Sequence, residues 1–329
     1  NSSLQIIDLR FLPDSAPVVY DSDSLIKTSH NIFIDRAAGY LYTCGGTSLR
    51  TDIATPYVTS NDLSIYSLKN PLEPELLINC KFDLDFWNEI KYVHDVYVEN
   101  DIAYCHAGTD GFFIVDFSDT ANVQLIGSLT QYPQQGYNHS GWLHQDGTIY
   151  AMADETWGTD IKILDVSDLN NIEVIDTIGS NINDSLSMVH NLIFREDYLF
   201  VSHFFDGLYI FDLTDPYDIK IAGYYDTSTE PHADRKWQGA WGVYPFLSSG
   251  KVLISDMENG FWLFDASNAI VLSESSSPEQ SINITIFPNP TSETLFINGL
   301  EQGDSNYIIS SIKGDIIESG KLYRPYLKL

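Results

Sequence analysis

GFFIVDFSDTANVQLIGSL at 111–129 contains two apolar runs joined by a short acidic turn. The same unit returns as IKILDVSDLNNIEVIDTI at 161–178 and as GLYIFDLTDPYDIKIAGYY at 207–225. GFWLFDASN at 260–268 lacks the second run, and LSIYSLKNPLEPELLINC at 63–80 is a weaker copy. Each unit is rich in β-branched and aromatic residues, which favours strands. The repeat therefore predicts an architecture built from one recurring β motif.

A second pair of apolar runs lies upstream of each unit. Each pair has a short polar turn between its runs, which is typical of a β-hairpin. The pairs are HNIFIDRAAGYLYTCG from His30, HDVYVENDIAYCHAG from His94, HSGWLHQDGTIYAMAD from His139, HNLIFREDYLFVSHF from His190 and WGVYPFLSSGKVLISD from Trp241. Two hairpins give four strands, the content of one propeller blade.

These pairs predict an all-β protein, a β-propeller of four-stranded blades at 1–268 with little helix. About five blades are expected: four whole blades and a fifth without its last strand. LQIIDLRFLPDSAPVVYD at 4–21 predicts a leading half-blade. The long step from His30 to His94 indicates insertions in the first blade, near 46–62 and 80–91.

Five short segments carry a resemblance to a known family. They are SHNIF at 29–33, YVHDV at 92–96, NHSGW at 138–142, VHNL at 189–192 and GAWGVYPFLSSG at 239–250. In content and order they resemble the LVIVD-repeat propellers, and more closely the choice-of-anchor B family. The resemblance implies a parent propeller of about seven blades.

The tail belongs to a different module. The repeat is lost after residue 268, and the serine-rich stretch at 269–281 predicts a linker. From 282 to 329 the chain reads as strands around a Pro-Asn-Pro turn at 288–290, which predicts a small β-sandwich. INITIFPNPTSETLFINGL resembles the C-terminal sorting domain of type IX secretion, although LYRPYLKL lacks the usual last strand, so the module is expected to be shortened. The resemblance implies the type IX secretion machinery as a partner and a secreted or outer-surface location in a Gram-negative bacterium.

Charge and cysteine usage narrow the function classes. The chain has 46 acidic and 17 basic residues, a net charge of -29, which repels nucleic acids and anionic membranes. No apolar run is long enough for a membrane span. Three cysteines without a Cys-x-x-Cys pair give neither a zinc knuckle nor a disulfide framework. Cys44 and Cys105 end strand-like runs, where we expect small buried apolar residues.

The candidate site is identified by where its residues stand in the repeat. The first strand of a propeller blade lines the central channel, so residues that open the first strands converge on the axis. Neutral imidazole suits divalent transition metals such as zinc, copper, iron or nickel. The histidines in this position are His30, His94, His139 and His190, with Trp241 in the fifth blade. Further candidate ligands end second strands: His106, Asp154, Glu155, His203 and Asp256.

Two functions fit these observations best, and a purely structural role in surface assembly is a third. The chain has no nucleophile elbow, zinc-protease motif or phosphate loop, which favours a non-enzymatic surface propeller that binds an extracellular protein or glycan. The alternative is a metal-binding protein or metal-dependent enzyme with its site at the axial histidines. Under the first hypothesis these histidines bond loop carbonyls and channel waters. Acidic turns such as DVSD at 165–168 predict capped turns instead of calcium loops.

Overall fold

The computed structural model divides the chain into two compact units, residues 1–8 with 17–272 and residues 9–16 with 273–329. The first unit contains the repeats and the second contains the tail. The structure describes residues 4–50, 57–182, 185–228, 235–270, 285–287, 294–298, 305–310, 316–322 and 326–328.

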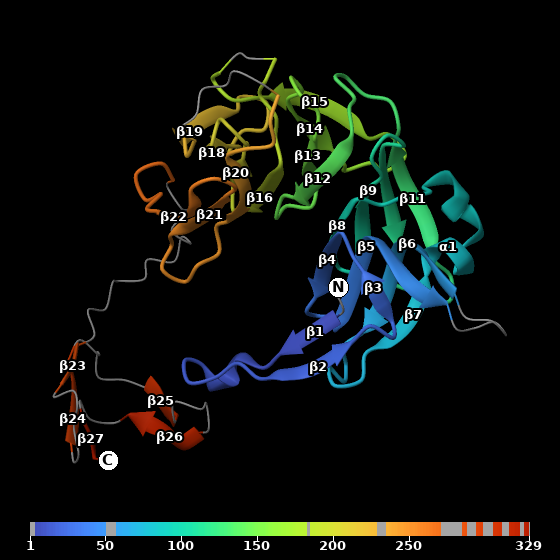
Figure 1. The fold of residues 1–329 in the computed structure, drawn as a ribbon. Helices are drawn as coiled ribbons and strands as arrows, with labels where there is room; N and C mark the ends of the chain where they lie inside the picture. Colours follow the sequence, from blue (N-terminus) through green and yellow to red (C-terminus); the bar gives the residue numbers. More distant parts are fainter. Residues whose placement is uncertain are drawn as a thin grey trace. The chain divides into compact units, whose positions relative to one another are not determined.

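The repeats fold into antiparallel sheets that follow one another in chain order as the blades of a β-propeller (Figure 1). Three blades have four strands each, hydrogen-bonded in sequence order. The second blade contains β8 (Asp95–Glu99), β9 (Ile102–His106), β10 (Phe112–Asp116) and β11 (Gln124–Leu129). The third contains β12 (Asn138–Leu143), β13 (Ile149–Asp154), β14 (Ile161–Asp165) and β15 (Glu173–Ile178). The fourth contains β16 (Asn191–Arg195), β17 (Tyr198–Ser202), β18 (Leu208–Asp212) and β19 (Lys220–Tyr225).

The first and fifth blades differ from these three. The first blade contains β3 (Ile26–Thr28), β4 (Asn31–Asp35), β5 (Tyr40–Arg50), β6 (Tyr57–Ser67) and β7 (Glu75–Asn79). The fifth has three strands, β20 (Ala240–Tyr244), β21 (Val252–Asp256) and β22 (Gly260–Phe264). A hairpin of β1 (Leu4–Ile7) and β2 (Val18–Ser22) precedes the first blade. The described residues thus confirm the predicted all-β fold, with its three-stranded fifth blade and its leading half-blade.

The insertions in the first blade also lie where the sequence predicts them. Strands β5 and β6 pair over their whole lengths, from Tyr40 with Ser67 to Arg50 with Tyr57. The second insertion forms α1 (Cys80–Asp83) and the 3-10 turn η2 (Asp85–Glu89). Helix is accordingly minor within the described residues.

Burial follows the position of a strand within its blade. Strand β17 is buried at every residue, and β10 is buried at its first four. Both are middle strands covered on both faces, which explains their nearly continuous apolar sequence. The last strands β11 and β15 have no fully buried residue.

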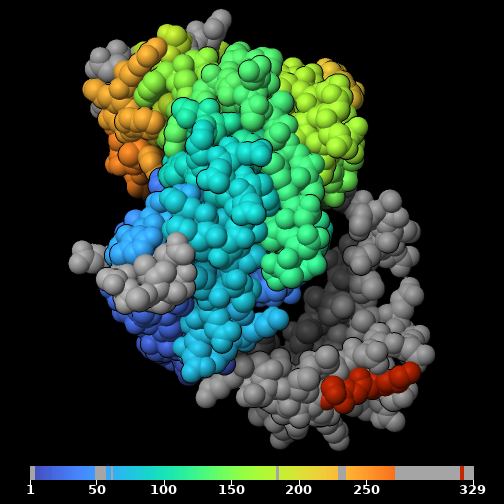
Figure 2. Space-filling view, turned by 90° about the vertical axis from the view of Figure 1, so that its right-hand side faces the viewer, coloured from blue at the N-terminus to red at the C-terminus, as the bar shows by residue number. Residues whose placement is uncertain are grey.

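The first strands of consecutive blades contact one another and form the inner side of the propeller. These contacts join β4 with β8, β8 with β12, β12 with β16 and β16 with β20. The space-filling view shows the second and third blades, teal to green, as one continuous surface (Figure 2). Residues that begin the first strands therefore share one end of the axis.

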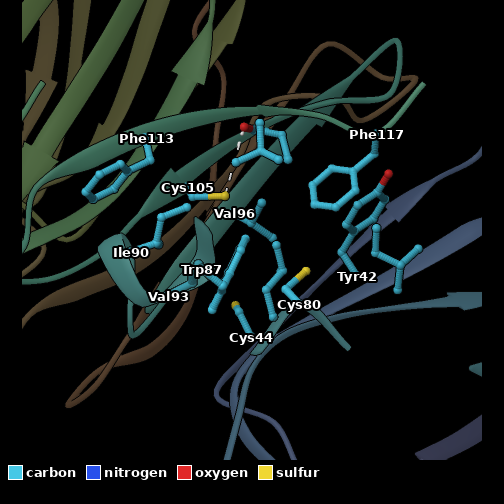
Figure 3. Packing of buried hydrophobic residues seen from close by; sticks show 14 of the residues in the cluster. Tyr42, Cys44, Cys80, Trp87, Ile90, Val93, Val96, Cys105, Phe113 and Phe117 are labelled. Carbon is cyan, nitrogen blue, oxygen red and sulfur yellow. Dashed lines mark hydrogen bonds between the residues drawn. The ribbon is translucent and has the colours of Figure 1, made fainter. Parts of the chain in front are cut away.

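The largest core cluster lies between the first two blades and under the inserted turn (Figure 3). Trp87 of η2 is 2% exposed and packs with Phe117 and Tyr42 in this cluster. Cys44 and Cys105 are free thiols with no exposed surface, which confirms the prediction that they are small buried apolar residues.

The second unit consists of short antiparallel ladders. One sheet has the order β23 (Thr285–Phe287), β24 (Thr294–Asn298), β27 (Tyr326–Lys328), and a separate pair joins β25 (Ser305–Ser310) with β26 (Ile316–Leu322). The Pro-Asn-Pro turn at 288–290 and all but the first two residues of the predicted linker at 269–281 lie outside the described residues. Among the helices of the described chain, none has the length and apolar character needed to cross a membrane.

Candidate metal centre on the propeller axis

Backbone hydrogen bonds fix where the axial histidines lie. The amide of His94 donates to the carbonyl of His106 at 2.7 Å, and the amide of His190 donates to Ser202 O at 3.0 Å. His30 N donates in the same way to Cys44 O at 2.9 Å. In each case the second strand of the blade holds the residue that opens the first strand. The hairpin repeat therefore places equivalent imidazoles at equivalent positions around the axis.

The imidazoles form a continuous row. Consecutive ring centroids are 4.0 Å apart for His30 and His94, 4.6 Å for His94 and His139, and 4.6 Å for His139 and His190. Trp241 extends the row, 3.9 Å from His190. The structure thus brings together all four histidines that the sequence singles out.

Three histidines of the row are buried and one is exposed. His94, His139 and His190 are 8%, 3% and 4% exposed, whereas His30 is exposed at the end of the row. Burial lowers the pKa of His94 and of His190 to about 4, and it takes the pKa of His139 well below its ordinary value. Neighbouring imidazoles lower the pKa of all three further. At neutral pH these rings are uncharged, so each has a nitrogen lone pair for a ligand bond.

Glu155 is the carboxylate of this cluster. Its Oε2 lies 3.8 Å from His139 Nε2 and its Oε1 lies 3.6 Å from His190 Nε2. Burial raises the Glu155 pKa to about 7. The Glu155 amide donates to Tyr137 O at 2.9 Å, which ties the carboxylate to the segment that leads into β12.

Three of these side chains satisfy the spacing of a metal site. One ligand atom from each of His94, His139 and Glu155 lies within 4.8 Å of the other two. Ligand atoms about 2 Å from one ion are at most about 4 Å apart, so the three must move together by less than about 1 Å. Among the described residues, His94 Nε2 and His139 Nδ1 are buried ring nitrogens without a hydrogen-bond partner, while the His139 nitrogen that faces Glu155 is Nε2. Such unsatisfied groups are rare in native proteins and call for an explanation.

The second nitrogens of two imidazoles have hydrogen-bond partners, and the partner of His190 fixes its tautomer. His94 Nδ1 lies 3.1 Å from the Tyr137 hydroxyl. His190 Nδ1 lies 2.5 Å from the carbonyl of Trp241, and a carbonyl can only accept, so His190 Nδ1 carries the proton. The lone pair of His190 is then on Nε2, the nitrogen nearest Glu155. Outer partners of this kind commonly orient histidines in metal sites.

Tyr137 is a site residue that the sequence interpretation missed. A signal was present, because Tyr92 and Tyr137 each stand two residues before an axial histidine, His94 and His139. The Tyr137 hydroxyl bonds to the histidine of the preceding blade, so its partner could not be found within its own repeat.

His106 and Asp154 lie beside the centre but have structural partners. His106 is fully buried, with Nδ1 2.9 Å from Asn138 Oδ1 and Nε2 2.9 Å from the Tyr150 hydroxyl. Both of its nitrogens are therefore occupied. Asp154 Oδ2 accepts from Lys162 Nζ at 2.9 Å, and its Oδ1 accepts from the Tyr132 hydroxyl at 2.9 Å.

His203 and Asp256 are also placed apart from the cluster of His94, His139 and Glu155. His203 Nδ1 lies 3.3 Å from Asp206 Oδ2 and 3.4 Å from Ser187 Oγ. Serine and aspartate face the same ring nitrogen, so the three do not form a catalytic triad, which needs them on opposite nitrogens. Asp256 caps its own turn by accepting from the amides of Glu258 and Asn259 at 2.9 and 2.7 Å.

No family model and no curated protein matches the sequence. Among solved structures, the chain is similar to a periplasmic gluconolactonase of Pseudomonas aeruginosa, with a TM-score of 0.52, 8% identity, and coverage of 94% of this chain and 74% of that one. It is also similar to a chain of a nidogen/laminin complex (TM-score 0.48, 12% identity, 82% and 88% coverage) and to a Lactobacillus plantarum protein (TM-score 0.49, 12% identity, 73% and 68% coverage). The likeness to the Pseudomonas structure supports the β-propeller fold and, at this identity, nothing beyond it.

Proposed function

We propose that this propeller binds a divalent transition metal ion on its axis, with His94, His139 and Glu155 as ligands. The observation that carries the proposal is the convergence of these three groups, two of them buried imidazoles that each keep a ring nitrogen without a hydrogen-bond partner in the described chain. His190 Nε2 faces the same carboxylate and is available as a fourth ligand.

The ligand set indicates the class of metal. Imidazole nitrogens suit zinc, copper, iron and nickel, whereas calcium and magnesium prefer oxygen ligands. Two or three imidazoles with one carboxylate leave a coordination position for an outside ligand, as in catalytic zinc sites. When bound, the ion would supply a Lewis acid at the end of the channel.

Metal titration of the full chain tests the proposal. After chelator treatment and dialysis, calorimetry with Zn²⁺ and Co²⁺ should show one tight site per chain. Glu155→Gln should weaken binding at least tenfold, since the variant keeps the size of the side chain and removes the charge. Glu173→Gln, on the exposed start of β15, is the matched control and should leave affinity unchanged. Absence of a stoichiometric site, or equal affinity in both variants, would refute the metal proposal.

We further propose that the chain belongs with the LVIVD-repeat and choice-of-anchor B propellers. The histidine-containing segments that carry the resemblance to these propellers are the segments that form the axial row.

We also propose that residues 282–329 act as a type IX sorting module. On this proposal the propeller is displayed at the outer surface of a Gram-negative bacterium and binds an extracellular protein or glycan there. Surface labelling of a type IX-secreting host that expresses the chain with and without residues 282–329 tests it. Equal labelling of the two forms would contradict it.

A further inference from the structure

A second feature of the channel lies next to the histidine row. A half-open pocket of about 160 Å³ is lined by the first three residues of β4 and β8 and by the corresponding residues of β12 and β16. These residues directly follow the four axial histidines in the chain. An apolar cavity of about 150 Å³ holds one benzene ring, so this pocket has the size for one small ring-shaped molecule.

Polar side chains form one wall of this pocket. Asn31 Nδ2 donates to Asp95 Oδ1 at 2.6 Å, and the Val96 amide donates to the same oxygen at 2.7 Å. The Ser140 hydroxyl donates to the carbonyl of His190 at 2.7 Å. The side-chain amide of Asn191 makes no hydrogen bond within the described part of the chain. The wall thus offers an amide that can both donate and accept, together with the second oxygen of a carboxylate.

Aromatic side chains form the other part of the lining, the aromatic wall. Phe33, Tyr97 and Trp142 stand two residues after Asn31, Asp95 and Ser140 on the same strands, so the aromatic and polar side chains share a face and follow one another along the strands. The ring centroids of Phe33 and Tyr97 are 5.4 Å apart, and those of Tyr97 and Trp142 are 4.6 Å apart. Tyr97 is further fixed because its hydroxyl donates to Glu99. The three rings contact one another, so the wall is held by packing.

The two walls match a ligand with two kinds of surface. An aromatic wall favours the apolar C–H face of a ring, and paired amide and carboxylate groups favour hydroxyls, which donate and accept at once. A cation is less suited, because Asp95 already accepts two N–H donors on one oxygen and is the pocket's only carboxylate. We propose that this pocket binds a small neutral polyhydroxylated ring, a single sugar or cyclitol unit, with its hydroxyls on Asn191 and Asp95 and its apolar face against the aromatic wall.

Calorimetry of the full chain with a panel of neutral monosaccharides and myo-inositol tests this assignment. Cyclohexanol and cyclohexylamine serve as comparators that keep the ring and replace the hydroxyls by one alcohol or one amine. At least one polyhydroxylated ring should bind saturably and more tightly than both comparators. If no member of the panel binds, or if a comparator binds as tightly, the proposal is wrong.

Variants locate the binding to the pocket. Asn191→Ala and Asp95→Asn should each weaken binding about tenfold, because each removes one hydrogen bond from a half-buried polar group to the ligand. Asn88→Ala, at an exposed asparagine of η2, should leave it unchanged. Equal affinity in all three variants would place the ligand elsewhere and overturn the proposal. The sugar titration is repeated in EDTA and should give the same affinity, so failure of the metal proposal and failure of this one are distinguishable.

Discussion

At the scale of single residues, the axial centre depends on side chains that hold Glu155 in place. Asp154, its neighbour, is fully buried with Lys162, and their side chains form a 2.9 Å ion pair. Asp154 Oδ2 also accepts from the Gly136 amide at 2.9 Å. The pair therefore anchors the end of β13, the point from which the Glu155 side chain extends to the histidines.

Lys162→Met should destabilise the propeller strongly. The change leaves the Asp154 charge buried without its cation, which costs about 3–5 kcal/mol in comparable sites. Urea unfolding measures the loss. Lys220→Met, which removes an exposed lysine from an ion pair with Asp218, is the control and should leave the free energy of unfolding within error. A Lys162 variant as stable as this control would show that the buried pair is dispensable.

At the scale of elements, β12 packs closely against β13 of its own blade and against the end of β9 in the second blade. A Cβ atom on Gly141 would lie 2.4 Å from Tyr150 Cε1 and 2.7 Å from both the Ala151 carbonyl oxygen and His106 Cε1. Strand β12 can therefore approach these residues closely only because position 141 has no side chain. The same approach places Trp142 against Tyr97 in the aromatic wall.

Gly141→Ala should lower the free energy of unfolding by about 1–3 kcal/mol, since the added methyl meets backbone and two packed rings. Thermal and urea unfolding check this result. Gly242→Ala in β20 is the control, because its added Cβ would meet only the Ser255 hydroxyl, whose rotation would cost one exposed hydrogen bond from the Gly242 amide. Equal effects of the two variants would mean that the close approach at Gly141 has no energetic weight.

The elements were predictable from sequence because each repeat carries its own hydrophobic pattern. The hairpins with an acidic turn, the row of histidines and the two insertions of the first blade, in the β5–β6 hairpin and after β7, all follow from periodicity within the chain. The site was only partly predictable. Of the acidic candidates at the ends of second strands, Glu155 faces the imidazoles, while Asp154 and Asp256 have structural partners.

Two side-chain contacts explain what the sequence could not provide, one between blades and one between strands of the same blade. Tyr137 reaches the histidine of another blade, and no spacing within one repeat encodes that pairing. Lys162 occupies a position of β14 that is aromatic in the other repeats, Phe113 in β10 and Tyr209 in β18. A lysine at this position is unexpected from the repeat. Only the structure shows that its partner is Asp154.

At the scale of the whole molecule, buried neutral imidazoles couple stability to pH. Burial lowers the pKa of His106 to about 3 and those of His94 and His190 to about 4, from an ordinary value of 6.5. Between these values the unfolded chain binds protons that the folded chain does not, so stability falls as pH decreases. Burial raises the pKa of Glu155 from 4.5 to about 7. Between these pH values the folded chain holds a proton on Glu155 that the unfolded chain has lost, so this carboxyl adds stability as pH decreases.

Metal-free protein should therefore lose stability between pH 6.5 and 4.5, because the lowered pKa values of four buried imidazoles outweigh the raised pKa values of two carboxyls, about 7 for Glu155 and about 6 for Asp95. Each fully titrating imidazole contributes at most about 1.4 kcal/mol for each pH unit. Urea unfolding in EDTA at a series of pH values measures the slope. A flat profile, or stability that rises towards pH 4.5, would show that these rings are not held neutral in the folded state.

The central claim is that a transition metal binds on the axis of the propeller. Its most direct test is an anomalous difference map at the zinc edge, from crystals of the full chain grown with Zn²⁺. We predict one strong peak about 2 Å from ring nitrogens of His94 and His139 and from a carboxylate oxygen of Glu155. A map with no peak between these side chains, or with zinc only on surface carboxylates, would contradict the account.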